Sequence, residues 1–470
     1  MENLSKPKHQ PKNMSTFLII WLGQFISIVG SGLTGFGLSV WVFTQTGKAT
    51  PMAITALAFN LPRILLSPIA GSVADRFNRK RIMIIADTAA VLITVGLAFL
   101  IYNDLLQVWH IYLSAALSSA FGSFQEPAYR SSITMLVPKK DLARAAGIQQ
   151  IGGAMQSILV PVLAGLLYGL IGFRGIILID IFTYFFAIGA LIWAYIPQPE
   201  LVTETGDGGK RSMLNDAVFG WKYLQARPGL VTLLLYFAVV NFFLSLSGVL
   251  AAPLVLSFGT PTDMGLVQMA GGAAMLIGGL LIGIWGGPKS KRIWFVIFTI
   301  FFSGFGFFIG GLKPLTWTVA LGQFVFLFFI PIAAALSQAV WQVKIPPGIQ
   351  GRVFAMRAML SMSVIPLANL IAGPLADRVF EPLMAEGGAL ANSVLGEFIG
   401  VGPGRGIAVI FLISALFLWA SSMVIFTYPR VRNLEEEIPD AIPDEQQEDT
   451  PPQATETSSI SEEAPLVAHP

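Results

Sequence analysis

The chain has 470 residues, of which 54% are hydrophobic and only 12% are charged, with a net charge of +2 at pH 7. Soluble domains carry about 25% charged residues, so this composition, with a mean hydropathy of +0.70, excludes an ordinary soluble protein. The absence of cysteine excludes disulfides, thiol catalysis and cysteine metal sites. Apolar runs of about 20 residues recur, and each is long enough to cross a membrane as a helix. The composition therefore predicts an all-α integral membrane protein.

Twelve apolar runs are predicted to span the membrane, six on each side of a polar segment. Their approximate ranges are 15–41, 50–70, 82–102, 107–127, 142–170, 174–196, 229–257, 263–286, 293–311, 314–337, 353–376 and 406–427. This division predicts two six-helix bundles. The expected segments are an N-terminal segment (1–14), an N-terminal bundle (15–196), a linker (197–228), a C-terminal bundle (229–428) and a tail (429–470).

The distribution of charge predicts the sidedness of these spans. An even number of spans places both termini on one side, and 23 of the 29 Lys and Arg residues then fall on that side or at its helix ends. Cytoplasmic segments carry the excess of Lys and Arg, so both termini and the linker are expected in the cytoplasm. Anionic lipid already offers these cations a partner, and we expect no nucleic acid. The tail is acidic and rich in Pro, Gln, Ser and Thr, a composition typical of disorder.

A basic hinge separates the second and third spans. Residues 71–81 read Gly-Ser-Val-Ala-Asp-Arg-Phe-Asn-Arg-Lys-Arg. The eighth span is followed by a weaker counterpart, residues 283–292, which aligns without gaps on residues 71–80 and is also basic. In this counterpart Gly287 stands where the first hinge has Asp75. Six plus six spans with a repeated hinge favour two bundles that rock about a central site.

Two charged residues lie in the spans that flank the hinge. Arg63 lies eight residues before Gly71, or about 12 Å into the membrane at the rise of a helix. It either serves in a cavity or extends to the interface and packs its stem on neighbours. Asp87 lies six residues after Arg81, about 9 Å into the membrane. Asp87 either pairs with the basic hinge or carries a proton.

Two further acidic residues lie in the first half. Glu126 stands four residues before Arg130, a spacing that allows an ion pair on one helix face, and proton carriage is the alternative. Asp180 lies towards the outer side, six residues after Arg174. Charges in the hydrocarbon are costly and usually functional. We therefore predict that the proton carriers and their charge partners are among Arg63, Asp87, Glu126, Arg130 and Asp180.

Polar side chains line one face of three predicted spans. In spans 1, 4 and 7 they recur at helical spacing, and these spans occupy equivalent positions in successive three-helix units. Such a face either lines a watery cavity or forms hydrogen bonds to a neighbouring helix. The predicted cavity-lining residues are Gln24, Ser27, Ser31, Thr34, Ser114, Ser118, Gln125, Asn241 and Ser245.

The basic hinge resembles motif A of the major facilitator transporters, G-x-L-A-D-R-x-G-R-R/K, with Asn78 where the motif has glycine. Asn tolerates a left-handed conformation, so the turn can survive. The resemblance implies the major facilitator fold and a conformational latch. In that latch Asp75 would cap or pair with the N-terminus of span 11 in the outward-open state, and the arginines would face acidic groups. The implied latch residues are Gly71, Asp75, Arg76, Arg79 and Lys80.

Two other stretches resemble the macrolide-efflux and enterobactin-exporter branch of this superfamily. They are Pro127-Ala-Tyr-Arg130 with Leu136-Val-Pro138 and Leu142, and Gly351-Arg-Val-Phe354 with Ala372-Gly-Pro-Leu-Ala-Asp-Arg378. The resemblance covers about residues 15–428. Span 5 keeps the proline and one glycine of the G-P-x-x-G-G pattern found in drug antiporters, as Val160-Pro-Val-Leu-Ala-Gly165.

The resemblance implies a secondary active transporter in the inner membrane. We expect proton-coupled efflux of an amphipathic small molecule, such as a drug, a siderophore or a peptide-like metabolite, by alternating access. Its expected partners are the substrate, protons and the lipid bilayer, and we expect a monomer without cofactor or metal.

Three other functions are alternatives to efflux. One is lysophospholipid or other lipid transport within the same superfamily, and another is a membrane sensor or scaffold that recruits a partner through the acidic tail. An integral-membrane enzyme is disfavoured, because the sequence lacks a nucleophile–base or metal constellation.

Overall fold

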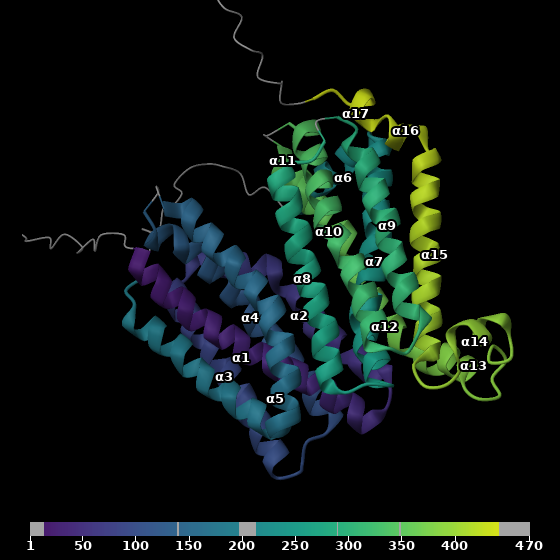
Figure 1. Ribbon diagram of the computed structural model, residues 1–470. Helices are drawn as coiled ribbons and strands as arrows, with labels where there is room; N and C mark the ends of the chain where they lie inside the picture. The colour runs from purple at the N-terminus through teal and green to yellow at the C-terminus, as the bar shows by residue number, and fades with distance from the viewer. Residues whose placement is uncertain (1–13, 139–140, 197–212, 289, 347–348, 441–470) are drawn as a thin grey trace, which may run out of the picture.

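The computed structural model describes residues 14–138, 141–196, 213–288, 290–346 and 349–440. Throughout these ranges the chain is helical and contains no strand. The helices form two bundles that lie side by side (Figure 1). The end of the molecule at which α1 begins and α15 ends is called the terminal end, and the end with the α1–α2 and α7–α8 turns is called the turn end.

The N-terminal bundle contains five helical elements that make six passes. These are α1 (Met14–Thr46), α2 (Ala49–Arg76), α3 (Arg79–Tyr102), α4 (Val108–Leu136) and α5 (Leu142–Trp193). The long α5 turns back on itself at Gly172, where φ is 65°. Glycine adopts this left-handed conformation without the steric cost that a side chain would bring. The two arms of α5 therefore serve as spans 5 and 6.

The C-terminal bundle begins with four continuous helices. These are α7 (Pro228–Leu256), α8 (Pro261–Trp285), α9 (Arg292–Leu312) and α10 (Thr316–Lys344). The eleventh pass is segmented into α11 (Gln350–Met362), α12 (Val364–Pro374), the π-helix η3 (Leu375–Phe380) and α13 (Glu381–Met384). After the short α14 (Val394–Ile399), the final pass is α15 (Arg405–Thr427).

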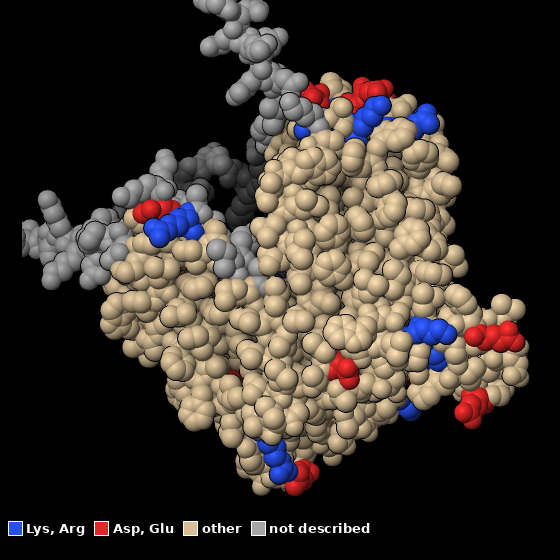
Figure 2. Space-filling model, in the orientation of Figure 1, with Lys and Arg blue, Asp and Glu red and all other residues tan. Residues whose placement is uncertain are grey.

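The predicted twelve-pass architecture is confirmed. Ten stretches of the described chain are long and apolar enough to cross a membrane, and one of them, Met155–Trp193, contains the bend at Gly172 and passes twice. The more polar α4, with 29 residues, supplies the remaining pass. On the face shown in Figure 2, most charged side chains lie near the two ends, with a largely uncharged band between them. This band matches the hydrocarbon core of a bilayer.

Two segments outside the predicted spans contain helices. The predicted linker (197–228) includes α6 (Met213–Gln225), and its first part lies outside the described residues. The tail, expected to be disordered from residue 429, begins with α16 (Pro429–Arg432) and α17 (Leu434–Glu437). Leu434 is fully buried against the C-terminal bundle. Residues 441–470 lie outside the described residues.

A buried lysine fixes the start of this tail. Lys344, at the end of α10, is only 6% exposed and forms an ion pair with Asp440, with 2.6 Å between Nζ and Oδ1. The same ammonium group donates to the carbonyl oxygens of Glu435 and Ile438. The Glu435 carboxylate in turn accepts from the backbone N–H of Ile293 at the start of α9. The composition of the tail did not predict this docking, because the docking depends on a lysine about 90 residues earlier in the chain.

The two bundles touch through their backbones at the turn end. The first arm of α5 packs on α8, and the start of α2 packs on α12. A methyl group on Gly265 would collide with the carbonyl oxygen of Pro161, and one on Gly373 would collide with the backbone of Thr50. Thr262 also donates a hydrogen bond to the Gly165 carbonyl oxygen at 3.4 Å. Away from this contact, the surface is hollowed between the bundles toward the terminal end (Figure 2).

The docked tail yields a stability prediction. Lys344→Met removes the ion pair and both hydrogen bonds, so residues 434–440 should detach more often. We expect a protease that cuts after glutamate to cleave at residues 435–437 about tenfold faster, the change that corresponds to about 1.4 kcal/mol of hydrogen bonding to a charged group. Lys313→Met, at the turn end, is the control. Equal cleavage rates in both variants would contradict the role of Lys344.

Candidate functional site

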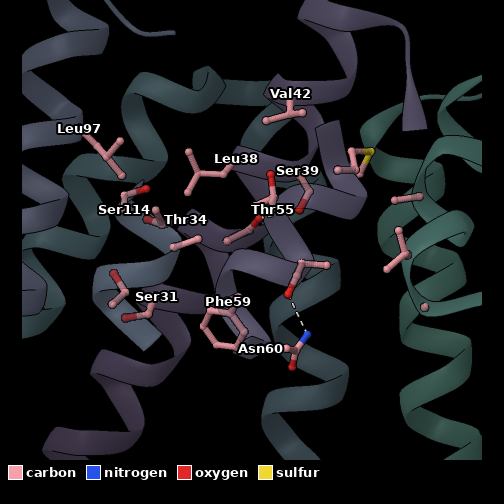
Figure 3. Close-up of a pocket in the computed structure, with 18 of the residues that line it drawn as sticks. Ser31, Thr34, Leu38, Ser39, Val42, Thr55, Phe59, Asn60, Leu97 and Ser114 are labelled. Atoms are coloured by element: carbon pink, nitrogen blue, oxygen red, sulfur yellow. Dashed lines mark hydrogen bonds between the residues drawn. The ribbon is translucent and has the colours of Figure 1, made fainter. Parts of the chain in front are cut away.

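A central cavity of about 580 Å³ lies between the two bundles. Helices of both halves line it, with α1, α2, α3, α4 and α5 from the first and α7, α8 and α12 from the second. Figure 3 shows side chains of α1, α2, α3 and α4 around this space, including Ser31, Ser39, Thr55, Asn60 and Ser114. Small-molecule sites typically enclose about 300–1,000 Å³, so the cavity fits a drug-sized ligand.

Amide and hydroxyl groups face the cavity from the C-terminal bundle. Ser245 of α7 donates a hydrogen bond of 2.7 Å to Oδ1 of Asn369 of α12. Asn369 is 1% exposed, and its Nδ2 group has no hydrogen-bond partner among the described residues. Gln268 of α8 lies on the same wall. A buried donor without a partner is costly, so this wall is suited to bind a polar acceptor on a ligand.

Asp180 is the only carboxyl group among the described residues that line the cavity, and no Lys, Arg or His is among them. It lies on the second arm of α5 and is 1% exposed. Ser31 of α1 donates to Asp180 Oδ1 at 3.4 Å and lies 2.9 Å from the Tyr184 hydroxyl. A methyl group on Gly30 would collide with Thr183, so α1 packs tightly against α5 beside this carboxyl group.

A second cavity of about 520 Å³ adjoins the first towards the terminal end, and Phe59 and Ser118 line both. We call this second cavity the vestibule. Within it Glu126 forms ion pairs with Arg63, at 2.5 Å, and with Arg130, at 2.7 Å. The spacing of Glu126 and Arg130 pointed to the second pair, whereas the first joins α2 to α4 and left no local signal. Arg63 thus lines a cavity and is also paired.

Asp87 forms a buried polar cluster with two glutamines. It is 3% exposed, and it accepts hydrogen bonds from Gln24 of α1, at 2.9 Å, and from Gln125 of α4. The two glutamines also bond to each other at 3.0 Å and line the vestibule. Among the described residues, neither Asp87 nor Asp180 forms an ion pair. One predicted role of Asp87 was pairing with the basic hinge. In the structure, Asp87 accepts hydrogen bonds from the amide groups of Gln24 and Gln125.

The predicted polar faces divide between cavity lining and helix packing. Five of the nine residues line the central cavity: Ser31, Thr34, Ser114, Ser118 and Ser245. Gln24 and Gln125 line the vestibule, as does Ser118. Ser27 is buried inside the first bundle, and Asn241 donates to the carbonyl oxygen of Ser361 at 3.2 Å. The nine residues are thus divided between the walls of the two cavities and the packing between helices.

Sequence reasoning missed several lining residues on other helices: Thr55, Asn60, Thr94, Tyr184, Gln268 and Asn369. Each of these residues is a single polar side chain within an apolar run. One or two such side chains do not define a polar helix face in the sequence. Among the described residues, no group of three or more His, Asp or Glu could hold a metal ion.

The basic hinge is described only in part. Gly71 and Asp75 lie in the last turns of α2, but the side chains of Asp75 and Arg76 lie outside the described residues. Asn78 has φ −61°, an extended rather than left-handed conformation, and it accepts from the backbone N–H of Arg81 as the N-cap of α3.

Two cations of the hinge bind backbone oxygens within their own bundle. Arg79 donates to the carbonyl oxygen of Ser131 at 3.1 Å. Lys80 donates to the carbonyl oxygens of Ile192 and Ala194. These bonds tie the hinge to α4 and to the end of α5.

The Asp87 cluster should contribute to stability. Gln125→Leu leaves the buried carboxyl group with one fewer donor and removes the bond between the two glutamines. We expect a lower melting temperature in detergent, equivalent to about 1–3 kcal/mol. Gln149→Leu, on the wall of the same vestibule, is the matched control and should melt near the wild-type temperature. A wild-type melting temperature for Gln125→Leu would show that the cluster does not hold α1, α3 and α4 together.

Comparison with known proteins identifies relatives of this chain. The chain is 27% identical over 375 residues to macrolide efflux protein A of Streptococcus pyogenes, covering 77% of this chain and 90% of the relative. It is 25% identical over 372 residues to the multidrug efflux pump Tap of Mycolicibacterium fortuitum, covering 77% and 89%.

Two solved structures share the fold. The nucleoside transporter NupG superimposes with a TM-score of 0.63 at 13% identity, covering 88% of this chain and 100% of that one. A bacterial homolog of the human lysosomal transporter Spinster, solved in an inward-facing and unoccupied conformation, gives 0.63 at 15% identity, covering 88% and 98%. The sequence profile of the Major Facilitator Superfamily matches residues 20–369. With the twelve passes and the cavity between two bundles, these matches establish that the chain belongs to the Major Facilitator Superfamily of membrane transporters.

Proposed function

We propose that this protein is a proton-coupled exporter of amphipathic small molecules that works by alternating access. The central cavity is the observation that carries the proposal, because it is drug-sized, is lined by both bundles and holds one carboxyl group without a cation. The efflux activity named for the macrolide and multidrug relatives supports the same class of substrate. Both halves of the machine lie in one chain, so we propose that it acts as a monomer.

The proposed orientation places the terminal end in the cytoplasm. The excess of Lys and Arg at this end supports it, since cytoplasmic segments carry such an excess. In this orientation the bundles are in contact at the outer face and apart at the inner face. Substrate would enter the vestibule from the cytoplasm or inner leaflet and reach the central cavity. Release to the outside would follow when the bundles rock about this site.

The lining chemistry supports a neutral or cationic amphipath as the substrate. Most of the wall is apolar, with hydroxyl and amide groups at intervals. An anionic substrate would meet Asp180 in a low-dielectric space, and like charges repel strongly there. A protonated amine would be attracted to the same carboxyl group. The Nδ2 group of Asn369, which has no partner among the described residues, would donate a hydrogen bond to an ether, ester or carbonyl oxygen on the substrate.

Asp180 is the proposed principal proton carrier, with Asp87 as a second carrier. Both are deeply buried carboxyl groups, and intramembrane acids of this kind mark proton relays in transporters. A proton can couple to transport only if protonation changes the relative stability of the two states. Glu126 is assigned a different role, because it is already paired with two guanidinium groups. Asp75, in the last turn of α2, remains the proposed motif A latch.

A cavity-filling variant tests the export function. Gly248 lines the cavity, and a side chain there would meet open space, so Gly248→Trp should fill the cavity without disturbing helix packing. We expect at least about a tenfold fall in energy-dependent efflux of a lipophilic macrolide or dye from a sensitive host, since the substrate loses its binding volume.

The matched control is Gly279→Trp in α8. Gly279 also faces open space but lies outside the cavity wall. It should retain efflux at the wild-type level. Full efflux by Gly248→Trp, or equal loss in both variants, would contradict transport through this cavity.

Proton coupling is tested in proteoliposomes loaded with a pH-sensitive dye. Asp180→Asn keeps the shape of the side chain but cannot release a proton, so substrate-driven proton movement should disappear while substrate binding persists. Asp104→Asn is the control, because Asp104 is an exposed carboxyl group paired with Arg174 at 2.5 Å. Normal proton movement in Asp180→Asn and in Asp87→Asn would overturn the proton assignment.

A further inference from the structure

The first turn of α2 is capped by a residue of the other bundle. Asp377, in η3 of the eleventh pass, accepts from the backbone N–H of Ala49 at 2.9 Å and of Thr50 at 2.7 Å. It also accepts from the Thr50 hydroxyl at 2.5 Å. Ala49 and Thr50 belong to the N-terminal bundle, so these three hydrogen bonds join the two halves of the transporter at the turn end.

The bonds supply what α2 lacks in its own sequence. The first N–H groups of a helix have no partner within it and need a cap. The N-cap residue of α2 is Lys48, whose side chain forms no capping bond. Pro51, the third residue of the helix, has no N–H to satisfy. Asp377 therefore binds the first two free N–H groups of α2, and its negative charge lies at the positive end of the helix dipole.

The backbone brings the two helices close enough for this contact. Gly373 lies one helical turn before Asp377, and any side chain on Gly373 would collide with the backbone of Thr50. The carboxylate thus lies one helical turn from a close backbone contact between α2 and α12. If the bundles separated at the turn end, both the capping bonds and this packing would be lost together.

The equivalent helix of the second half is capped differently. In α8, the second pass of that half, Thr260 and Asp263 form a capping box within the same helix. Asp263 also accepts from Thr316 of α10, at 2.8 Å, within the same bundle. This cap does not depend on the position of the other bundle. The chain therefore contains two Asp-capped helices at one end of the molecule, and one cap is supplied across the interface.

The sequence around Asp377 is similar to the basic hinge, which lies at the opposite end of α2. Residues 373–378 read Gly-Pro-Leu-Ala-Asp-Arg, and residues 71–76 read Gly-Ser-Val-Ala-Asp-Arg. The first copy ends α2 at the terminal end, and the second lies near the end of the eleventh pass at the turn end. The start of α2 is thus hydrogen-bonded to the second copy, and the last turns of α2 contain the first copy.

We propose that Asp377 is the gate residue that holds the transporter closed at the turn end. Its three bonds to the start of α2 stabilise the state in which the cavity opens toward the terminal end, and they must break before the cavity can open at the turn end. The proposal rests on alternating access, but it does not depend on the substrate or on proton coupling.

The test measures access to the cavity from each side of the membrane. The chain has no cysteine, and Gly35 lines the cavity in open space, so Gly35→Cys supplies one reporter thiol. A membrane-impermeant maleimide is added to right-side-out and to inverted vesicles, and labelling is normalised to the denatured protein. Asp377→Ala should label from the turn-end side about tenfold faster than the parent, the effect of losing about one net hydrogen bond to a charged group. Labelling from the terminal side should slow.

Two further variants distinguish loss of the gate from a general loss of stability. Asp263→Ala removes the matched cap within one bundle, and it should leave both labelling rates unchanged even if it lowers the melting temperature. Gly373→Ala keeps Asp377 but forces α2 and α12 apart, and it should also speed labelling from the turn-end side. Wild-type labelling rates in Asp377→Ala and in Gly373→Ala would overturn the gate, as would an equal increase in Asp263→Ala. Loss of proton coupling or of efflux would not alter this readout, so failure of the gate and failure of the proposed function are distinguishable.

Discussion

The direct contact of backbones at the turn end is the constraint on which the arrangement of the two bundles depends. Gly265 and Gly373 allow the helices to approach so closely that no side chain fits between them. Because hydrocarbon cannot satisfy a free backbone or charged group, each bundle satisfies most of its polar groups internally, as in the Asp87 cluster and the ion pairs of Glu126. In the proposed alternating-access cycle the bundles would then move relative to each other while few polar bonds change. The cap on α2 is among the bonds that we propose must break.

The cavity and the vestibule follow from the same arrangement. Closure at the turn end and separation toward the terminal end leave a continuous space between the bundles, with Phe59 and Ser118 where its two parts meet. The charge of the lining residues differs between the two parts of this space. The vestibule has one carboxylate between two guanidinium groups, which leaves one excess positive charge, whereas the central cavity has the carboxyl group of Asp180 without a cation. The proposed substrate would therefore pass a vestibule with a net positive charge before it meets an acid without a cation.

The fold was predictable from sequence because the thickness of the hydrocarbon core sets a minimum length for a spanning helix. Twelve apolar runs of the sequence are long enough. Local pairs such as Glu126 with Arg130 were predictable for a similar reason, since helical spacing alone brings them together. The contacts of Arg63 with Glu126, of Lys344 with Asp440 and of Asp377 with α2 were not. Each joins residues far apart in the chain, and their pairing depends on how helices pack. The polar faces were predicted, but which of their residues line a cavity and which bond to a neighbouring helix depends on the same packing.

The central claim is that the bundles pivot as bodies, with closure at the turn end opposed to closure at the terminal end. Spin-label distances measured in lipid bilayers test it most directly, with one pair across the turn end, Gln45→Cys with Trp317→Cys, and one across the terminal end, Arg81→Cys with Ser290→Cys. All four positions are exposed or nearly so. Without substrate, we expect a short, narrow distance at the turn end and a longer one at the terminal end. During turnover a second population should appear in which the turn-end distance lengthens and the terminal-end distance shortens. Distances that stay fixed, or that lengthen together at both ends, would contradict it.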